Sequence, residues 1–208
     1  MSKKMRGLNN IIECSEKHKE RFIEIFSQAF FEDPLFIAVF KDPEFRRKKL
    51  IPFFDEAFRY GLKFGRIYAS SENLEGMIVC LPPNNTYRNF LKEIKVINLK
   101  IFLQIFWIYL KIWNNVDKCH GSAHKRHAPF NHFYIMSFAI DPKFQRRGYG
   151  SALMQYIIKV VNKSNLPIYL ETQNEKNLSF YEKFDFEVLE EEIIQKLDVK
   201  TWYLLKKY

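Results

Sequence analysis

The feature that most constrains the fold is a buried strand followed directly by a glycine-containing turn and a helix. Residues 132–140 read HFYIMSFAI, and an almost continuous apolar run of this length fits a strand that is buried on both faces. Asp141-Pro142 ends the strand, and the turn QRRGYG at 145–150 leads into an amphipathic helix from Ser151 to Val161. This order of elements predicts a chain of mixed α/β class.

The turn combines glycines with cationic side chains at the start of a helix. A helix N-terminus carries unpaired N–H groups and partial positive charge, and glycines let a phosphate approach those groups. The alternative is a tight connection that needs glycine for backbone reasons alone. No Gly-Lys-Ser/Thr follows, and Met154 stands near where a dinucleotide turn needs its third glycine. The residues predicted to bind a phosphate or pyrophosphate are Gln145, Arg146, Arg147, Gly148, Tyr149, Gly150 and Ser151.

Length and composition favour one domain, 1–208, without a flexible linker. The chain has 208 residues, of which 47% are apolar, with only seven glycines and eight prolines. Cys14, Cys80 and Cys119 are odd in number and far apart, which supports neither a disulfide framework nor a cysteine zinc site. Because no secretory signal precedes the first helix, we expect a cytoplasmic protein.

The charge of the chain points to a solvated basic surface. The formal net charge is +9, but the Lys and Arg residues are scattered and form no stripe of the kind that binds nucleic acid. The apolar segment Ile94–Trp113 has Ile101–Leu110 as its longest uncharged run, which is short of the roughly 20 residues that span a bilayer. We therefore expect neither a nucleic-acid nor a membrane partner, with interfacial membrane contact as the alternative for this segment.

Further helices and strands are predicted on both sides of the central unit. Apolar residues recur at helical spacing from Ser15 to Phe31, where Asp33-Pro34 ends the helix, and from Phe45 to Phe64. The other expected elements are strands at Arg66–Ser70, Met77–Leu81, Pro167–Glu171, Phe186–Ile194 and Trp202–Lys206, and helices at Tyr87–Asn114 and Asn177–Phe184.

Motifs in the C-terminal half resemble those of the GNAT superfamily of acetyl-coenzyme A-dependent N-acetyltransferases. The turn matches the family signature Q/R-x-x-G-x-G/A, and the stretch PIYLETQNEKNLSFYEKFDF at 167–186 matches the pattern that follows it. The matching residues are Gln145, Gly148, Gly150, Asn177, Tyr181 and Phe186. Asp185 stands where the family usually has glycine, and aspartate tolerates the left-handed backbone that such a turn needs. More weakly, AFFEDPLF in the N-terminal half is similar to the puromycin-type branch.

The resemblance implies a specific fold and co-substrate. The fold would be α/β (α+β), with a central mixed, mostly antiparallel sheet of about six to seven strands flanked by helices. Two strands would splay apart at the cofactor site, and a long helical insertion would precede the cofactor strand. The co-substrate would be acetyl-coenzyme A, and no metal is expected.

The resemblance also assigns contacts with coenzyme A. The backbone of Phe138, Ala139 and Ile140 would lie against the pantetheine arm and thioester, and the turn at 145–151 would bind the pyrophosphate. An N–H near Phe138 would polarise the thioester carbonyl as its oxygen gains charge. Asn177 would hydrogen-bond the pantetheine or position the helix, with a simple helix cap as the alternative.

Proton transfer is assigned only in part. Tyr181 would donate a proton to the departing thiolate, and the alternative is an ordinary core aromatic residue. A general base has to take the proton of the attacking amine, directly or through water. Tyr134 occupies the position where some histone-type relatives carry a glutamate. The remaining candidates are Glu171, His132 and a water relay.

A histidine-rich stretch at 119–132 is expected to form a loop. It contains His120, His124, His127 and His132, at spacings that match no known zinc finger. A solvated connector, a wall of the acceptor pocket and a metal site are the three interpretations.

Together these observations predict an enzyme that moves an acetyl group from acetyl-coenzyme A to a primary amine of a small molecule. No Cys or Ser is placed as an activated nucleophile, which favours direct attack in a ternary complex. Aromatic residues dominate the helices expected to wall the pocket, which favours a small acceptor. The alternatives are a peptide or protein amine as acceptor, and a non-catalytic acyl-coenzyme A-binding module. The sequence leaves open whether the protein is a monomer or a homodimer.

Overall fold

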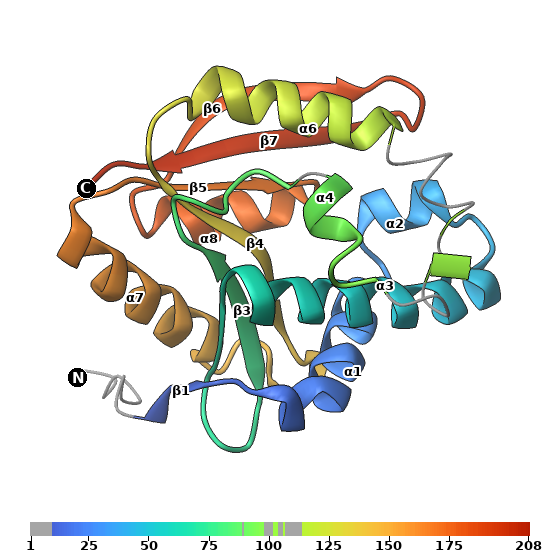
Figure 1. Cartoon of the computed structure of the whole chain (residues 1–208), viewed down its shortest axis with the longest axis horizontal. Coiled ribbons are helices and arrows are strands. Elements are labelled where there is room, and N and C mark those ends of the chain that lie inside the picture. Colours follow the sequence, from blue (N-terminus) through green and yellow to red (C-terminus); the bar gives the residue numbers. More distant parts are fainter. Residues whose placement is uncertain (1–9, 89, 98–101, 104–105, 107–113) are drawn as a thin grey trace.

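The computed structural model describes residues 10–88, 90–97, 102–103, 106 and 114–208. Within them, a seven-stranded sheet has the order β1-β2-β3-β4-β5-β7-β6, with helices packed around it (Figure 1). Neighbouring strands are antiparallel except for β4 and β5, which confirms the mixed, mostly antiparallel sheet. The strands are β1 (Ile12–Glu13), β2 (Arg66–Ala69), β3 (Gly76–Leu81), β4 (Phe133–Ile140), β5 (Ile168–Thr172), β6 (Glu187–Ile194) and β7 (Val199–Lys206).

The helices expected from periodicity are present with shifted ends. The described helices are α1 (Lys19–Ala29), α2 (Pro34–Val39), α3 (Pro43–Phe64), α4 (Phe90–Glu93), α6 (Asn114–His127), α7 (Tyr149–Val161) and α8 (Leu178–Glu182). None of them is both long and apolar enough to cross a membrane.

The two faces of the sheet bury separate sets of apolar side chains. Because side chains alternate along a strand, Met77 and Val79 of β3 pack beneath α1 and α3, while Ile78 packs on the opposite face with α7. Phe22 and Phe26 of α1 stack with ring centroids 3.9 Å apart in the first of these clusters. A third, smaller cluster lies beneath α6 and includes Tyr169 and Tyr203.

Asp33-Pro34 separates α1 from α2. The first helix ends at Ala29, a few residues earlier than the prediction, and Asp33-Pro34 begins a second, short helix that the sequence did not predict. Asp33 Oδ1 accepts a hydrogen bond of 3.0 Å from the N–H of Leu35, and Pro34 fills the first helical position. A capping aspartate followed by proline is a favourable helix start, so the same dipeptide both ends one helix and begins the next.

The parallel pair β4 and β5 separates soon after it begins. Only Phe133 pairs with Ile168 and Tyr134 with Tyr169, although β4 continues to Ile140. On its other edge β4 stays paired with β3, where the register shifts between Val79 and Cys80. The splayed pair expected at the cofactor site is therefore present.

Two predictions in the middle of the chain need correction. The helix expected at 87–114 is interrupted, because α4 ends at Glu93 and a turn follows at 94–96. Residues 102, 103 and 106 are helical as predicted, and the other half of the expected helix lies outside the described residues. The prediction that the histidine-rich stretch forms a loop is wrong for residues 119–127, because they belong to α6. Its helical pattern is weak because few positions are apolar, and the helix is stabilised by packing of Ala123 and His124 against Tyr169 and Tyr203.

Asp185, in contrast, behaves as expected. Its φ of 61° lies in the left-handed region, so aspartate makes the turn before β6 in place of the family's glycine. The side chain also accepts a hydrogen bond of 3.2 Å from Lys206 Nζ.

We predict that Phe22→Ala lowers the free energy of unfolding by about 3–5 kcal/mol, because the ring is fully buried and its removal leaves a cavity. Phe45→Ala is the control, since 47% of this residue is exposed, and should cost less than about 1 kcal/mol. Urea denaturation followed by circular dichroism measures both. Equal losses would contradict the assignment of the core to the α1–α3 face.

Candidate active site

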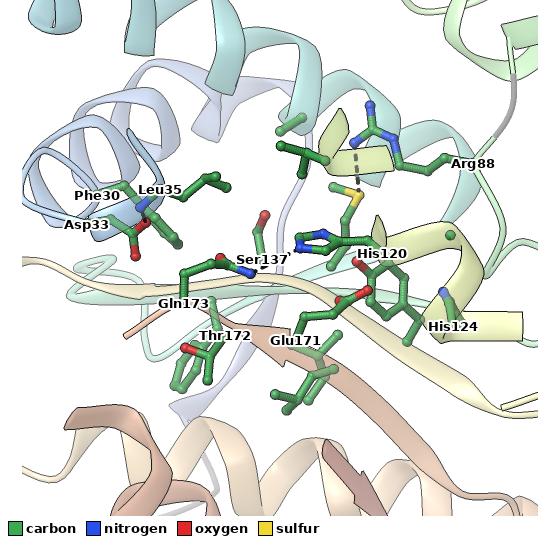
Figure 2. A pocket seen from close by; sticks show the side chains of 18 of the residues that line it. Phe30, Asp33, Leu35, Arg88, His120, His124, Ser137, Glu171, Thr172 and Gln173 are labelled. Atoms are coloured by element: carbon green, nitrogen blue, oxygen red, sulfur yellow. Dashed lines mark hydrogen bonds between the residues drawn. The ribbon is translucent and has the colours of Figure 1, made fainter. Parts of the chain in front are cut away.

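A cavity of about 670 Å³ opens where β4 and β5 separate (Figure 2). The walls come from α1 to α3, from β4 and β5, and from α6, with residues 86–88 closing another side. The wall contributed by α1 to α3 is largely aromatic and includes Phe30, Phe36, Phe53 and Phe54. A concave site of this size with a few polar groups among apolar ones is typical of a small-molecule pocket.

Three of the predicted site residues meet in this cavity. Phe138, Asn177 and Tyr181 all line it, although β4 and α8 are far apart in the sequence. Asn177 Nδ2 donates a hydrogen bond of 3.1 Å to Thr172 Oγ1 at the end of β5. The Asn177 side chain makes no capping hydrogen bond to α8.

Tyr181 belongs both to the core and to the cavity wall. Its ring packs between Phe180 and Phe186, with centroid distances of 5.4 and 5.7 Å. Burial raises the pKa of the Tyr181 hydroxyl above its ordinary value. At neutral pH the phenol therefore keeps its proton and can donate it.

A carboxylate faces the aromatic part of the cavity. Asp33 lines the cavity and is 9% exposed, and burial raises its pKa to about 6, although hydrogen bonds from the N–H groups of Leu35 and Phe36 oppose the shift. The sequence predicts only that Asp33-Pro34 ends a helix. Nothing in the sequence says that its carboxyl group points into a pocket.

The turn after β4 has the geometry expected of an anion site. Gly148 is the N-cap of α7 with a φ of 91°, and a Cβ built there would meet nothing within 4 Å among the described residues. The N–H groups of Tyr149, Gly150 and Ser151 form the first helical turn, where N–H groups lack partners within the helix. A second cavity, of about 360 Å³, lies beside Arg147, Gly148 and Tyr149.

Gly150 lies beside two aromatic rings. A Cβ on Gly150 would lie 3.4 Å from the ring of Phe138 and 3.7 Å from that of Phe180, which are ordinary van der Waals distances, so alanine would also fit there. Of these two glycines, only Gly148 has the left-handed backbone that favours glycine.

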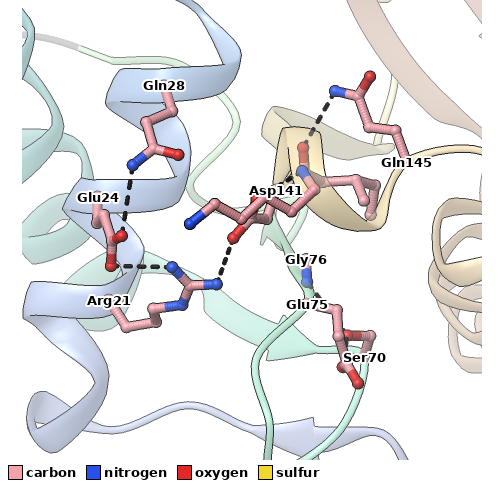
Figure 3. Close-up of polar contacts among 10 residues, drawn as sticks. Arg21, Glu24, Gln28, Ser70, Glu75, Gly76, Asp141 and Gln145 are labelled. Carbon is pink, nitrogen blue, oxygen red and sulfur yellow. Dashed lines mark hydrogen bonds and ion pairs between the residues drawn. The ribbon is translucent and has the colours of Figure 1, made fainter.

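Asp141 holds the start of the turn in place through its polar contacts (Figure 3). It is almost fully buried, accepts a hydrogen bond of 2.8 Å from the N–H of Lys143, and forms an ion pair with Arg21 of α1. Burial alone would raise the Asp141 pKa, but these two contacts outweigh it and lower the pKa. Gln145 Nε2 donates to the carbonyl of Ile140 at 3.2 Å, which ties the turn to the end of β4.

The remaining predicted residues surround the turn without lining the main cavity. Arg146 is exposed and has a left-handed φ of 59°, and Arg147 lies over the ring of Phe144 at 5.5 Å. Ala139 is buried in the cluster beneath α1 and α3. Neither Ile140 nor Ser151 lines the main cavity.

The candidates for the general base occupy different places. Glu171 lines the cavity, whereas His132 is 1% exposed and does not line it. His132 contacts the cavity wall through His124, with 2.7 Å between the two Nε2 atoms. Tyr134 lines the wall where histone-type relatives would place a glutamate.

Two histidines of α6 form part of the wall. Burial lowers the pKa of His120 to about 4 and that of His124 to about 3, so both rings are neutral at pH 7. His120 Nε2 lies 3.4 Å from Gln173 Nε2 and from Thr201 Oγ1 (Figure 2 shows the contact with Gln173). Among the described residues, no group of three or more His, Cys, Asp or Glu side chains is arranged to hold a metal ion.

Arg88 holds the segment that closes the cavity. It forms ion pairs of 2.9 Å with Glu56 of α3 and 2.7 Å with Glu93 of α4, and its guanidinium lies 4.5 Å from the centroid of the Tyr60 ring. Arg88 Nη1 also points at Met136 Sδ at 3.6 Å (Figure 2). These contacts fix residues 86–88 against the aromatic wall.

The comparisons with known proteins agree with this geometry. Residues 100–186 match the model of the acetyltransferase (GNAT) family. This part of the chain is a GNAT acetyltransferase domain. It is accordingly an acyltransferase, and the matched residues include β4, the turn, β5 and α8.

Solved structures share the fold over 95% of this chain. One of these structures, from Corynebacterium glutamicum, is described as histone acetyltransferase HPA2 and related acetyltransferase. It is 18% identical to this chain, the match covers 95% of each chain, and the TM-score is 0.67. The C-terminal condensation domain of Ebony, in complex with beta-alanyl-dopamine, has 10% identity, covers 95% of this chain and 98% of its own, with a TM-score of 0.66. A putative arylalkylamine N-acetyltransferase from the yellow fever mosquito Aedes aegypti is 12% identical to this chain. The match covers 95% of this chain and 86% of the mosquito protein, with a TM-score of 0.61.

We predict that Asp33→Asn stabilises this GNAT protein at pH 7. The folded-state pKa of about 6 exceeds the ordinary aspartate value of 3.8, so the unfolded chain loses this proton first as the pH rises, and ionisation destabilises the fold. Asparagine keeps the N-cap without the buried charge. The gain should be absent below pH 4, grow between pH 4 and 6, and reach about 1–3 kcal/mol at pH 7.

Urea unfolding of wild type and Asp33→Asn at pH 4 and pH 7 measures this difference. Asp42→Asn is the matched control, because Asp42 caps α3 with a bond to the N–H of Phe45 and is exposed. It should change the free energy of unfolding by less than about 0.5 kcal/mol. A loss of stability in Asp33→Asn at pH 7 would show that the carboxylate is not an unfavourable buried charge.

Proposed function

We propose that this protein transfers an acetyl group from acetyl-coenzyme A to a primary amine of a small molecule, by direct attack in a ternary complex. The observation that carries the proposal is one cavity with two kinds of wall. Tyr181, Asn177 and Phe138 line the part between the splayed strands, and Asp33 lies among aromatic rings from α1 to α3. A proton donor and a carboxylate in a shared pocket suit acyl transfer to an amine that arrives as a cation and loses a proton before it attacks.

The turn and the splayed strands fit coenzyme A. When bound, acetyl-coenzyme A supplies an acetyl group activated as a thioester. The N–H groups at 149–151, with the open space beside Gly148, would hold the pyrophosphate, and Arg146 and Arg147 would add positive charge. Beyond Tyr134, β4 is not paired with β5 within the described residues, so that edge of Phe138–Ile140 is open to hydrogen-bond the pantetheine arm.

Electrostatics of the site would assist both ends of the reaction. An N–H near Phe138 would stabilise negative charge on the carbonyl oxygen. Tyr181, kept protonated by burial, would donate its proton to the leaving sulfur. Asn177, tied to Thr172, would hold the pantetheine against β5.

Asp33 is placed to receive the amine. An ionised carboxylate at the edge of an aromatic pocket attracts an ammonium group, and the rings can add cation–π attraction. A pKa near 6 also makes Asp33 basic enough to take the proton that the amine must lose before attack. Glu171 of β5 is the second carboxyl group of the cavity and the alternative acceptor of this proton.

The aromatic wall favours an apolar, aromatic amine of small size. The mosquito neighbour is a putative arylalkylamine N-acetyltransferase, and the Ebony domain is seen with beta-alanyl-dopamine, which supports this class of acceptor. The Corynebacterium neighbour is related to a histone acetyltransferase, so peptide amines belong in the same screen. Acetylation of peptides but not of aromatic amines would contradict a small-molecule acceptor and support a peptide or protein amine instead.

We predict that Ser151→Glu weakens acetyl-coenzyme A binding at least about tenfold relative to Ser151→Gln. Both side chains fit the third helical position of α7, so the two variants differ mainly in a negative charge beside the pyrophosphate. Isothermal titration calorimetry gives the two dissociation constants. Equal affinities would place the pyrophosphate elsewhere, and no binding by the wild type would end the proposal.

We predict that Tyr181→Phe lowers kcat about 10- to 100-fold with little change in KM for acetyl-coenzyme A, because only the proton donor is removed. Phenylalanine fits the same contacts with Phe180 and Phe186. Tyr68→Phe is the control, since Tyr68 is a buried tyrosine on β2 that does not line the cavity. If both variants keep the wild-type kcat, Tyr181 is only a core residue.

A further inference from the structure

A histidine pair at the side of the cavity formed by α6 fixes the direction of a hydrogen bond. His124 Nε2 and His132 Nε2 lie 2.7 Å apart, and His132 Nδ1 lies 2.7 Å from the carbonyl oxygen of Phe130. Both histidines are at least 95% buried, at 5% and 1% exposure. Contacts this short have to contain a proton on one partner and a lone pair on the other.

The carbonyl of Phe130 determines where the protons sit. A carbonyl only accepts, so His132 carries its proton on Nδ1, and in the neutral ring its Nε2 is a bare acceptor. His124 must then donate from Nε2, which leaves Nδ1 of His124 without a proton. Among the described residues Nδ1 of His124 has no hydrogen-bond partner, and His124 lines the cavity.

The surroundings keep the pair neutral. The His124 ring stacks on Tyr169 at 4.4 Å and contacts Tyr87 and Tyr134 at 4.7 and 5.0 Å, and no carboxylate is among these contacts. Burial is the main cause of the lowered pKa of both histidines, and mutual repulsion between their charged forms lowers that of His124 further. His124 therefore offers the cavity a hydrogen-bond acceptor and no donor.

His124 lies at the opposite side of the cavity from Asp33. Figure 2 shows Asp33 beside Phe30 and Leu35 on one side and His124 on the other, with Ser137, His120 and Glu171 between them. An acceptor whose ammonium lies at Asp33 would thus extend its far end toward His124. A buried nitrogen lone pair is costly when it is left without a donor.

We propose that the acceptor carries a hydrogen-bond donor, a hydroxyl or N–H group, at the end remote from its amine, and that His124 accepts a hydrogen bond from this donor. This inference rests on the proposed function. His124 is then a specificity-determining residue that selects among aromatic amines. His132 is a positioning residue, because it fixes the tautomer of His124 without touching the substrate.

The experiment compares phenethylamine with its meta- and para-hydroxyl derivatives as acceptors for acetyl-coenzyme A. These probes share the amine and the ring and differ only in a hydroxyl group. One hydrogen bond to a neutral acceptor corresponds to a change in kcat/KM of about three- to tenfold. The kcat/KM of the preferred hydroxyl isomer should therefore exceed that of phenethylamine by this factor.

The variant that tests the role of the pair is His124→Phe combined with His132→Phe. Replacing both partners by apolar rings leaves neither nitrogen unpaired, so the protein is expected to fold, which circular dichroism checks. The double variant should lose the preference for the hydroxyl derivative, measured as the ratio of its kcat/KM to that of phenethylamine in the same variant. Tyr169→Phe is the control, because it keeps the stacked ring beside His124 and should keep the preference.

The outcomes separate the two proposals. If no amine is acetylated, the proposed function fails. If phenethylamine and both derivatives react with equal kcat/KM, or if the double variant retains the preference, the role of His124 is overturned while the proposed function stands. Nitrogen-15 NMR of the imidazoles adds a readout that does not use activity: His124 should show a protonated Nε2 and a bare Nδ1, and the opposite tautomer would contradict the inference.

Discussion

The separation of β4 from β5 after two residue pairs is the constraint on which the site depends. It exposes the edge of β4 at Phe138, opens the cavity toward α8, and brings Tyr181 and Asn177 to the same space as α1 to α3. If the two strands stayed paired, their ladder would fill the place assigned to pantetheine. β3 supports the open strand from its other side, and Asp141 with Arg21 fixes its end.

The cavity joins elements whose sequences carry very different signals. The turn and the helix α8 could be predicted because their chemistry is local: a left-handed glycine before a helix, and an asparagine and tyrosine at fixed spacing. Asp33 could not be predicted as a pocket residue, because a capping aspartate before proline reads the same whether its carboxyl group faces solvent or a cavity. Only the packing of α1 to α3 decides that.

The histidines illustrate the same limit. Spacing along 119–132 suggested a loop, since α6 has few apolar positions, yet the helix packs on the tyrosines of β5 and β7. The contact between His124 and His132 joins a helix to the residue just before β4, and no periodic pattern in the sequence predicts this contact. His132 is a candidate base in the sequence, and in the structure it is buried next to His124 and does not line the cavity.

The measurement that tests the account most directly is two-substrate initial-rate kinetics, with acetyl-coenzyme A and an aromatic primary amine both varied. A shared cavity for both substrates predicts double-reciprocal lines that intersect, and intact-mass spectrometry should find no acetylated enzyme when the amine is omitted. Parallel lines together with a covalent acetyl-enzyme would contradict direct attack. A protein that binds acetyl-coenzyme A but acetylates no amine would contradict the assignment of the aromatic wall and Asp33 to an acceptor.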